Sequence, residues 1–258
     1  MDVRLVSYTR NPIFTAERAA AKCYNSTPSM KGAIIDACYK SGHLSVMEHM
    51  SFTFDIRGIS RVTLAQLTRH RIASFSVRSQ RYCSESNSAW ICPPSIQKGN
   101  QRARDVFNAS MKASKKAYNE LRDLGVPQED ARYVLPEATC TELVCTMNMR
   151  ELINFCNLRL CNRAQWEIRE LAKEMRRVVG DAIPLLKKYL KPRCEANRKH
   201  PYCPEEHSCG KHKTLDELWG EGEEDEILDE MEQIVAPDYK YEDEDDDVVD
   251  DEDEGENE

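Results

Sequence analysis

RHRIASFSVRSQRY, residues 69–82, places four arginines, one histidine and three serines within fourteen positions. Holding several guanidinium groups side by side costs electrostatic repulsion and side-chain entropy. An anionic ligand offsets that cost, because an arginine fork binds phosphate or carboxylate oxygens through two parallel hydrogen bonds. A solvated basic edge is the other interpretation of such a cluster, but the spacing of these residues favours a ligand site.

The segment before this stretch predicts a strand followed by a helix. Residues 51–56 (SFTFDI) alternate apolar and polar positions as a half-buried strand does. Residues 59–68 then predict a helix on which Gln66 lies three positions before Arg69, so that both side chains project from nearly one face. An amide can match the alternating acceptors and donors of a uracil edge. Gln66 is therefore a candidate for pyrimidine recognition, with an exposed surface glutamine as the alternative.

The remaining patterns predict an α+β fold, with a mixed or antiparallel sheet flanked by long helices. Asn148 is a candidate helix N-cap, and Glu151 three residues later completes a capping-box-like pattern. The other expected elements are a strand within residues 1–10, a helix capped by Thr15, a helix over 30–40 ending at Gly42, helices over 101–124 and 128–136, a strand over 139–147, and helices from Asn148 to about Leu190.

Charge is distributed very unevenly along the chain. The whole chain carries 36 basic and 45 acidic residues, and residues 221–258 contain 22 of the acidic ones but only Lys240 as a basic one. The tail therefore carries −21, and residues 1–220 carry +12. Such an acidic tail cannot bury enough apolar surface to fold alone, so we expect it to be disordered. The expected organisation is a single catalytic domain over 1–192, a Cys/His-containing extension over 193–220 and the tail over 221–258.

Composition excludes some classes of protein and location. No apolar run approaches the roughly 20 residues that a membrane span needs. The first residues, MDVRLV, lack the apolar stretch of a secretory signal. The eleven cysteines are scattered through apparently helical, core-like segments, which favours reduced thiols in a cytoplasmic protein.

Two segments contain residues that bind metals in other proteins. Residues 42–49 (GHLSVMEH) combine two histidines with a carboxylate, but no Asp, Cys or third His follows at a suitable distance, so metal is the weaker interpretation. For His49 a core hydrogen bond is a further alternative. The late cluster Cys194, Cys203 and Cys209, with His200, His207 and His212, lacks a C-x-x-C pair, and a loop with reduced thiols is preferred to a metal knuckle.

The chain as far as residue 190 resembles the flavin-dependent thymidylate synthases. An Arg-His-Arg triplet, seven residues and then Ser79 is similar to the signature of that family, and Gln80-Arg81-Tyr82 also fits. Four further segments match family patterns in order along the chain: the Gly-His and Glu-His pattern of 42–49, the Ala131-Arg132 pair before Leu135-Pro136, and the segments 148–159 and 161–169.

The resemblance implies roles for individual residues. Arg159 looks like the nucleotide-activating, catalytic arginine, and His43 would lie near the folate. The residues that the resemblance assigns to dUMP are Gln66, Arg69, Ser79, Arg81, Arg132 and Arg159. Those that it assigns to FAD are Ser45, Glu48, Arg69, His70, Arg71, Asn148, Arg150 and Asn154, and no metal is expected. For Arg132, pairing with Glu129 or Asp130 is the structural alternative.

The resemblance also implies a reaction. The family converts dUMP, methylene-tetrahydrofolate and NADPH to dTMP, tetrahydrofolate and NADP⁺, with FAD delivering hydride to the pyrimidine, and it assembles as homotetramers with shared active sites. The Pro-Cys-His tripeptide in which conventional thymidylate synthases present their nucleophile does not occur here. Ser79 has no obvious adjacent base, so positioning or hydrogen bonding to the nucleotide is its better role.

One position departs from the family pattern. Members carry Glu or Gln two residues before the signature serine, where this chain has Val77, and Arg78 is the candidate replacement. Val77 keeps open a non-catalytic relative as one alternative. A basic nucleic-acid-binding module is another, although aromatic residues are not interleaved with the basic ones as single-strand binding requires.

Overall fold

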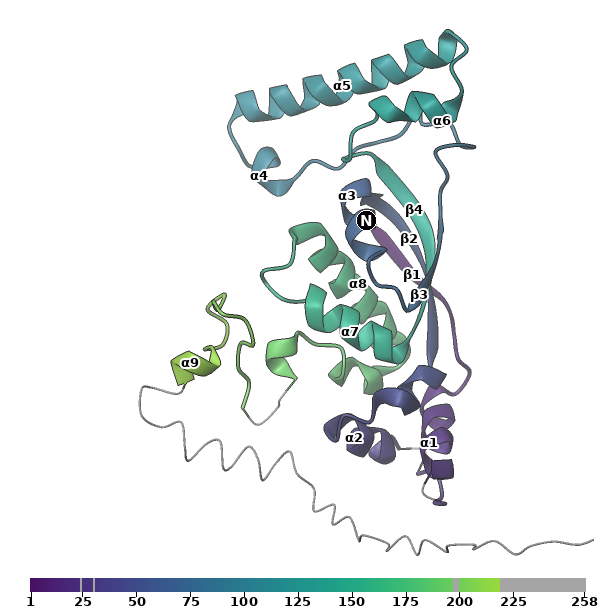
Figure 1. The fold of residues 1–258 in the computed structure, drawn as a ribbon, viewed down its shortest axis with the longest axis vertical. Helices are drawn as coiled ribbons and strands as arrows, with labels where there is room; N and C mark the ends of the chain where they lie inside the picture. Colours follow the sequence, from purple (N-terminus) through teal and green to yellow (C-terminus); the bar gives the residue numbers. More distant parts are fainter. Residues whose placement is uncertain (24, 30, 197–199, 219–258) are drawn as a thin grey trace, which may run out of the picture.

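A four-stranded antiparallel sheet forms the centre of the computed structural model, which describes residues 1–23, 25–29, 31–196 and 200–218 (Figure 1). The strands lie in the order β1 (Asp2–Tyr8), β2 (Ser51–Ser60), β4 (Cys140–Asn148) and β3 (Ala73–Val77). Each neighbouring pair is antiparallel. The predicted α+β class is confirmed.

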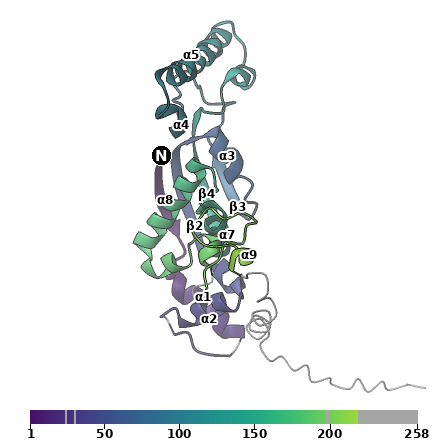
Figure 2. The same ribbon diagram turned by 90° about the vertical axis from the view of Figure 1, so that its left-hand side faces the viewer.

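The two central strands alternate as the sequence predicts. Phe52, Phe54 and Ile56 of β2 have no exposed surface, whereas the residues between them are half-buried. Strand β4 shows the same period of two. The buried face packs against helices α7 (Met149–Arg159) and α8 (Trp166–Ala182), which cover one side of the sheet in Figures 1 and 2.

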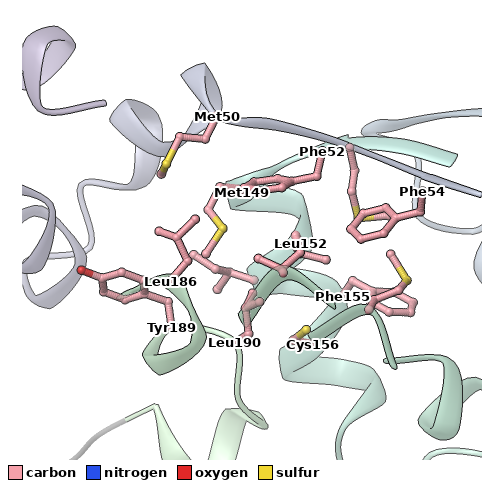
Figure 3. Close-up of a cluster of buried hydrophobic side chains, with 14 of the residues drawn as sticks. Met50, Phe52, Phe54, Met149, Leu152, Phe155, Cys156, Leu186, Tyr189 and Leu190 are labelled. Atoms are coloured by element: carbon pink, nitrogen blue, oxygen red, sulfur yellow. The ribbon is translucent and has the colours of Figure 1, made fainter. Parts of the chain in front are cut away.

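The hydrophobic core fixes α7 in place. Figure 3 shows side chains from the sheet, from α7 and from residues 186–190 meeting in one cluster. Its labelled members are all fully buried: Met50, Phe52, Phe54, Met149, Leu152, Phe155, Cys156, Leu186, Tyr189 and Leu190. Each large apolar side chain of this kind stabilises the fold by about 1.5–3 kcal/mol. Helix α7 is therefore held between the sheet and residues 186–190.

Several helix boundaries differ from the prediction, and two of these differences have a clear physical reason. Helix α1 (Pro12–Cys23) begins three residues before Thr15, whose Oγ1 donates to the Asn11 carbonyl inside the first turn instead of capping it. Pro12 suits the first helical position, because its missing N–H would be unpaired there in any case. Helix α8 ends at Ala182 and not near Leu190, since Pro184 cannot continue a helix. The short helix η3 (Pro184–Lys188) follows.

The remaining elements lie at the two ends of the sheet. Helices α1 and α2 (Ala33–Lys40) occupy one end, and α4 (Pro94–Gln97), α5 (Gln101–Asp123) and α6 (Gln128–Ala131) occupy the other (Figure 1). The short elements are η1 (Leu44–His49), α3 (Arg61–Leu67), η2 (Arg132–Val134), η4 (Arg193–Glu195) and α9 (Leu215–Leu218). Nowhere in the described ranges does a helix combine the length and apolarity required to cross a membrane. The acidic tail lies outside the described residues.

Candidate active site

The junction between β4 and α7 builds one part of the site. Asn148 is both the last residue of β4 and the N-cap of α7, and its side-chain oxygen accepts from the Glu151 backbone N–H at 2.9 Å. The predicted cap is confirmed. Strand β2 begins opposite this point, because Ser51 pairs with Asn148 and the Met149 N–H donates to the Met50 carbonyl at 2.7 Å. The start of α7 therefore lies beside the end of η1.

This junction brings several of the expected flavin residues to the surface. Arg150 Nη1 lies 2.6 Å from Glu48 Oε1, and both side chains are about half exposed. His43 and Ser45, at the start of the same short helix, are also exposed. A surface ion pair of this kind contributes little to stability. Breaking the ion pair therefore costs little free energy, so Arg150 and Glu48 can each contact a ligand instead of one another. His49 is exposed too, so it is not a core histidine.

A second part of the site surrounds His70, which is only 5% exposed. Its Nδ1 lies 2.7 Å from Glu151 Oε1, and its Nε2 accepts from Arg159 Nε at 3.2 Å. The ring meets Phe155 edge-on, with centroids 5.0 Å apart. Arg159 also reaches the Gln66 carbonyl through Nη2 at 3.5 Å. The histidine of the signature triplet therefore points inward and supports Arg159, with both of its ring nitrogens engaged.

The electrostatics of this group favour a neutral imidazole beside concentrated positive charge. Burial lowers the pKa of His70, and the charge of Arg159 lowers it further, while Glu151 acts in the opposite direction. Burial also lowers the pKa of Arg159, and the charge of Arg69 adds to that effect. The half-buried guanidinium of Arg159 thus stands near that of the exposed Arg69, an arrangement that an anionic or electron-rich ligand stabilises.

A third group of predicted residues gathers around Glu129. Arg81 Nε lies 2.8 Å from Glu129 Oε2, and Arg132 Nε donates to the Glu129 backbone carbonyl at 3.0 Å. Ser79 Oγ accepts from the Arg81 backbone N–H at 3.2 Å and so shapes the turn that carries Arg81. The predicted ligand Arg132 therefore also makes a local contact with Glu129, though to its backbone and not to its carboxylate.

A cavity of about 320 Å³ opens next to this third group. It is lined by Arg61, Gln80, Arg132, Tyr133, Leu135, Pro136 and Glu137. Arg61 Nε is buried without a hydrogen-bond partner, while its Nη2 donates to the Arg78 carbonyl at 3.1 Å. Burial lowers the pKa of Arg61, and Arg132 lowers it further. The cavity therefore presents positive charge, as a phosphate site requires.

The structure also explains position 77. Val77 packs against the core together with Phe75, two residues earlier on the same face of β3. Arg78 Nη1 lies 3.3 Å from Glu142, and Arg78 Nε lies 3.6 Å from the buried Glu85. Arg78 is therefore paired with two protein carboxylates, while Val77 packs against the core.

The Cys/His-containing extension packs against the loop that follows α7. Arg163 Nη1 donates to the His207 carbonyl at 3.0 Å, and Asn162 Nδ2 donates to Cys209 Sγ at 3.6 Å. A cavity of about 380 Å³ lies between the two segments, with Arg159, Cys161, Cys194, Cys203 and Cys209 in its wall. Within the described ranges, no three His, Cys, Asp or Glu side chains are arranged to hold a metal ion. The extension thus forms a wall beside Arg159.

Two residues of the site were not predicted as functional. The sequence indicated Glu151 only as part of a capping box, yet its carboxylate contacts His70, and Asn154 Nδ2 reaches both of its oxygens at 3.3 Å. Arg61 gave a weak signal, since a cation in the first turn of a helix opposes the helix dipole. Such a placement suggests a specific role.

The chain resembles known proteins along most of its length. Residues 4–185 match the family described as "Thymidylate synthase complementing protein". The flavin-dependent thymidylate synthase of Geobacter sulfurreducens is 42% identical over 234 residues, which cover 86% of this chain and 99% of that protein. The enzyme of the same description from Pyrococcus abyssi is 41% identical over 221 residues, covering 79% and 89% of the two chains.

A solved structure shows the same architecture. The flavin-dependent thymidylate synthase ThyX of Helicobacter pylori, in complex with FAD and dUMP, matches with a TM-score of 0.61 and 26% identity. The match covers 74% of this chain and all of that one. The chain therefore belongs to the flavin-dependent thymidylate synthase family.

Proposed function

We propose that this protein converts dUMP to dTMP by reductive methylation, with methylene-tetrahydrofolate as the carbon donor and NADPH-reduced FAD as the source of hydride. The observation that carries the proposal is the partly desolvated Arg159, which rests on the neutral His70 and lies near a second cation, Arg69. A fixed cation beside the pyrimidine stabilises negative charge as it develops on the ring.

The exposed residues around the β4–α7 junction and the Arg-His-Arg triplet fit a flavin dinucleotide. Arg69, Arg71 and Arg150 offer cations for its phosphates, and amides from Asn148 and Asn154 offer further contacts, with Ser45 and Glu48 on the neighbouring η1. We leave His70 out of the contact set that the sequence predicted, because both its ring nitrogens are engaged inside the protein. When bound, FAD supplies the hydride chemistry that side chains lack.

We assign the nucleotide to the two arginine groups. Arg81, Arg132 and Ser79 would hold the phosphate, since Arg132 lines the positively charged cavity that also contains Arg61. Gln66, Arg69 and Arg159 would hold the pyrimidine. Arg159 reaches the backbone of Gln66, so these residues already lie together in the chain without a ligand.

The cysteines favour a route without a thiol nucleophile. Burial raises the pKa of Cys145 to about 12 and that of Cys156 to about 12, and it also raises the pKa of Cys140 and Cys194. A nucleophilic cysteine needs the opposite, a pKa lowered toward neutrality. Burial therefore disfavours these four cysteines as the nucleophile, which is consistent with hydride delivery in place of covalent attack on the pyrimidine.

The wider setting also belongs to the proposal. We infer a homotetramer with active sites shared between copies, His43 near the folate and a cytoplasmic location, the last because scattered cysteines suit a reducing compartment. NADPH and methylene-tetrahydrofolate are the inferred co-substrates. The nucleic-acid-binding alternative predicts a colourless protein whose binding to DNA weakens steeply with salt.

Titration with FAD followed by single-turnover kinetics tests the proposal. We expect saturable FAD binding, and we expect dUMP with methylene-tetrahydrofolate to accelerate oxidation of the reduced flavin while dTMP forms. Absence of FAD binding at any workable concentration would refute the cofactor assignment. FAD binding without dTMP formation would indicate a non-catalytic relative.

A further inference from the structure

We propose that Glu151 is a positioning residue for the reaction: its buried carboxylate fixes the tautomer of His70, and through His70 it orients Arg159. The inference rests on the proposed role of Arg159 at the pyrimidine. Glu151 lies on the inner side of His70, on the same helix as Arg159 but one imidazole ring away from it. Glu151 is absent from both sets of residues that the resemblance assigns to dUMP and to FAD.

The contacts leave His70 a single consistent hydrogen-bonding arrangement. The Nε–H of Arg159 is a donor, so the facing Nε2 of His70 must be an acceptor without a proton. The neutral ring then carries its proton on Nδ1, which donates to Glu151 at 2.7 Å. In a neutral imidazole, the partner of one nitrogen thus determines what the other can do.

Burial keeps His70 and Glu151 from forming alternative hydrogen bonds with water. The side chains of His70 and Glu151 are 4% and 5% exposed, so water offers few alternative partners. Asn154 holds both carboxylate oxygens, and the edge of the His70 ring packs on Phe155. The carboxylate and the ring are therefore both fixed before any ligand binds, which is what preorganised catalysis requires.

Removing the carboxylate would free the other tautomer. With a proton on Nε2, the ring and Arg159 Nε would face each other as two donors, and the guanidinium would have to move. The charged groups that face His70 are Glu151 and Arg159, both from α7, and the charge of Arg69 acts on Arg159. Loss of Glu151 would leave the Gln66 carbonyl as the remaining acceptor of Arg159, at 3.5 Å from its Nη2.

Steady-state kinetics on the FAD-loaded protein separates positioning from simple structural loss. Glu151→Leu replaces the carboxylate by an apolar side chain and so removes the acceptor for the Nδ1 proton of His70. We expect it to lower kcat about 10- to 100-fold, the range found when a residue that orients a metal-binding side chain is mutated. The KM for dUMP should change far less, because Arg81 and Arg132 still hold the phosphate. Glu151→Gln keeps an acceptor for the Nδ1 proton and should restore most of kcat.

Two further variants guard against misreading a folding defect. His70→Gln places an amide oxygen where Nε2 was, so Glu151→Leu should cost little additional kcat in that background. Glu17→Gln alters another buried carboxylate, which lies in α1 and accepts from the Ser29 hydroxyl and from the Ile34 N–H of α2. This variant should lower the melting temperature without changing kcat. Equal losses of kcat in Glu151→Leu and Glu17→Gln would overturn the inference.

Nitrogen-15 NMR of the histidine ring gives a readout independent of turnover. In the wild-type protein at neutral pH we expect His70 to be the Nδ1–H tautomer, assigned by comparison with His70→Gln. A wild-type ring protonated on Nε2, or unchanged kcat in Glu151→Leu, would overturn the inference. Absence of dTMP formation by the wild-type protein would refute the proposed function instead. The NMR measurement would still test whether Glu151 fixes the tautomer of His70, because it does not depend on turnover.

Discussion

At the scale of single residues, the arginines assigned to the nucleotide fall into two sets that differ in their protein contacts. Arg159 is half-buried on top of His70, and its partners are fixed in the core. Arg81 and Arg132 contact Glu129 near the surface. A contact that strengthens as charge develops affects kcat, whereas one made equally in the ground and transition states affects KM. The two sets should therefore respond differently to mutation.

Arg159→Lys should lower kcat by more than it raises the KM for dUMP. Lysine keeps the charge but loses the planar fork that donates to both His70 and the Gln66 carbonyl. Loss of such an electrostatic stabiliser costs on the order of 10²–10³ in rate. Arg132→Ala is the comparison and should mainly weaken dUMP binding. Oxidation of the reduced flavin by Arg159→Lys at the wild-type rate would assign the activating role to another residue.

The residue scale is also where sequence reasoning reached its limit. The resemblance assigned Arg159, Gln66 and Arg69 to one dUMP site, and the structure shows Arg159 in contact with the Gln66 carbonyl and near the charge of Arg69. Sequence reasoning did not find the contact between His70 and Glu151, since 81 residues separate the two and no local pattern links them. Pairing of this kind is decided by packing in three dimensions.

At the scale of elements, the strongest patterns were the most predictable. The alternation in β2 and β4 and the cap at Asn148 follow from local rules, and the structure confirms them. Strand β3 was not predicted, although ASFSV alternates, because the arginines around it dominate the stretch. The end of α8 was placed too late, because apolar periodicity continues past Pro184 into η3.

Asn148→Ala tests the element that links the sheet to the site. Loss of a helix N-cap costs about 0.5–2 kcal/mol, so we expect a lower melting temperature together with weaker FAD binding. Asn100→Ala is the matched control: Asn100 caps α5 through the Ala103 N–H at 2.8 Å, in the arm at the other end of the sheet. It should lower stability comparably and leave FAD affinity unchanged. Equal FAD affinities in the two variants would remove Asn148 from the proposed cofactor site.

At the scale of the whole molecule, two of the predicted nucleotide residues, Arg132 and Arg159, line different cavities among the described residues. Arg132 lines the cavity near the α5 arm, whereas Arg159 lines the one beside the extension. An active site shared between copies would bring residues of the two groups together across a subunit contact. That proposal makes a prediction about mixed assemblies.

At dUMP concentrations well below the KM of Arg132→Ala, Arg132→Ala chains and Arg159→Ala chains should each show little activity alone and should recover activity when assembled together. If each site takes one arginine from each of two copies, a 1:1 mixture should regain about a quarter of the wild-type activity in a symmetric homo-oligomer. Co-expression with two affinity tags isolates the mixed assembly, and a mixture of Arg159→Ala with Arg159→Lys chains is the control that should not recover. A mixed assembly without recovery would place both arginines in the site of a single chain.

The direct passage from β4 into α7 at Asn148 limits where this chain can change its length. One residue inserted there would rotate α7 by about 100°, since the helix turns once in 3.6 residues. Glu151 and Arg159 would then lose their contacts with His70, although the sequence would still contain every residue of the site. Insertions and deletions are thus excluded from this junction, and the loops around α4 and α5, away from the core, are where the chain can lengthen.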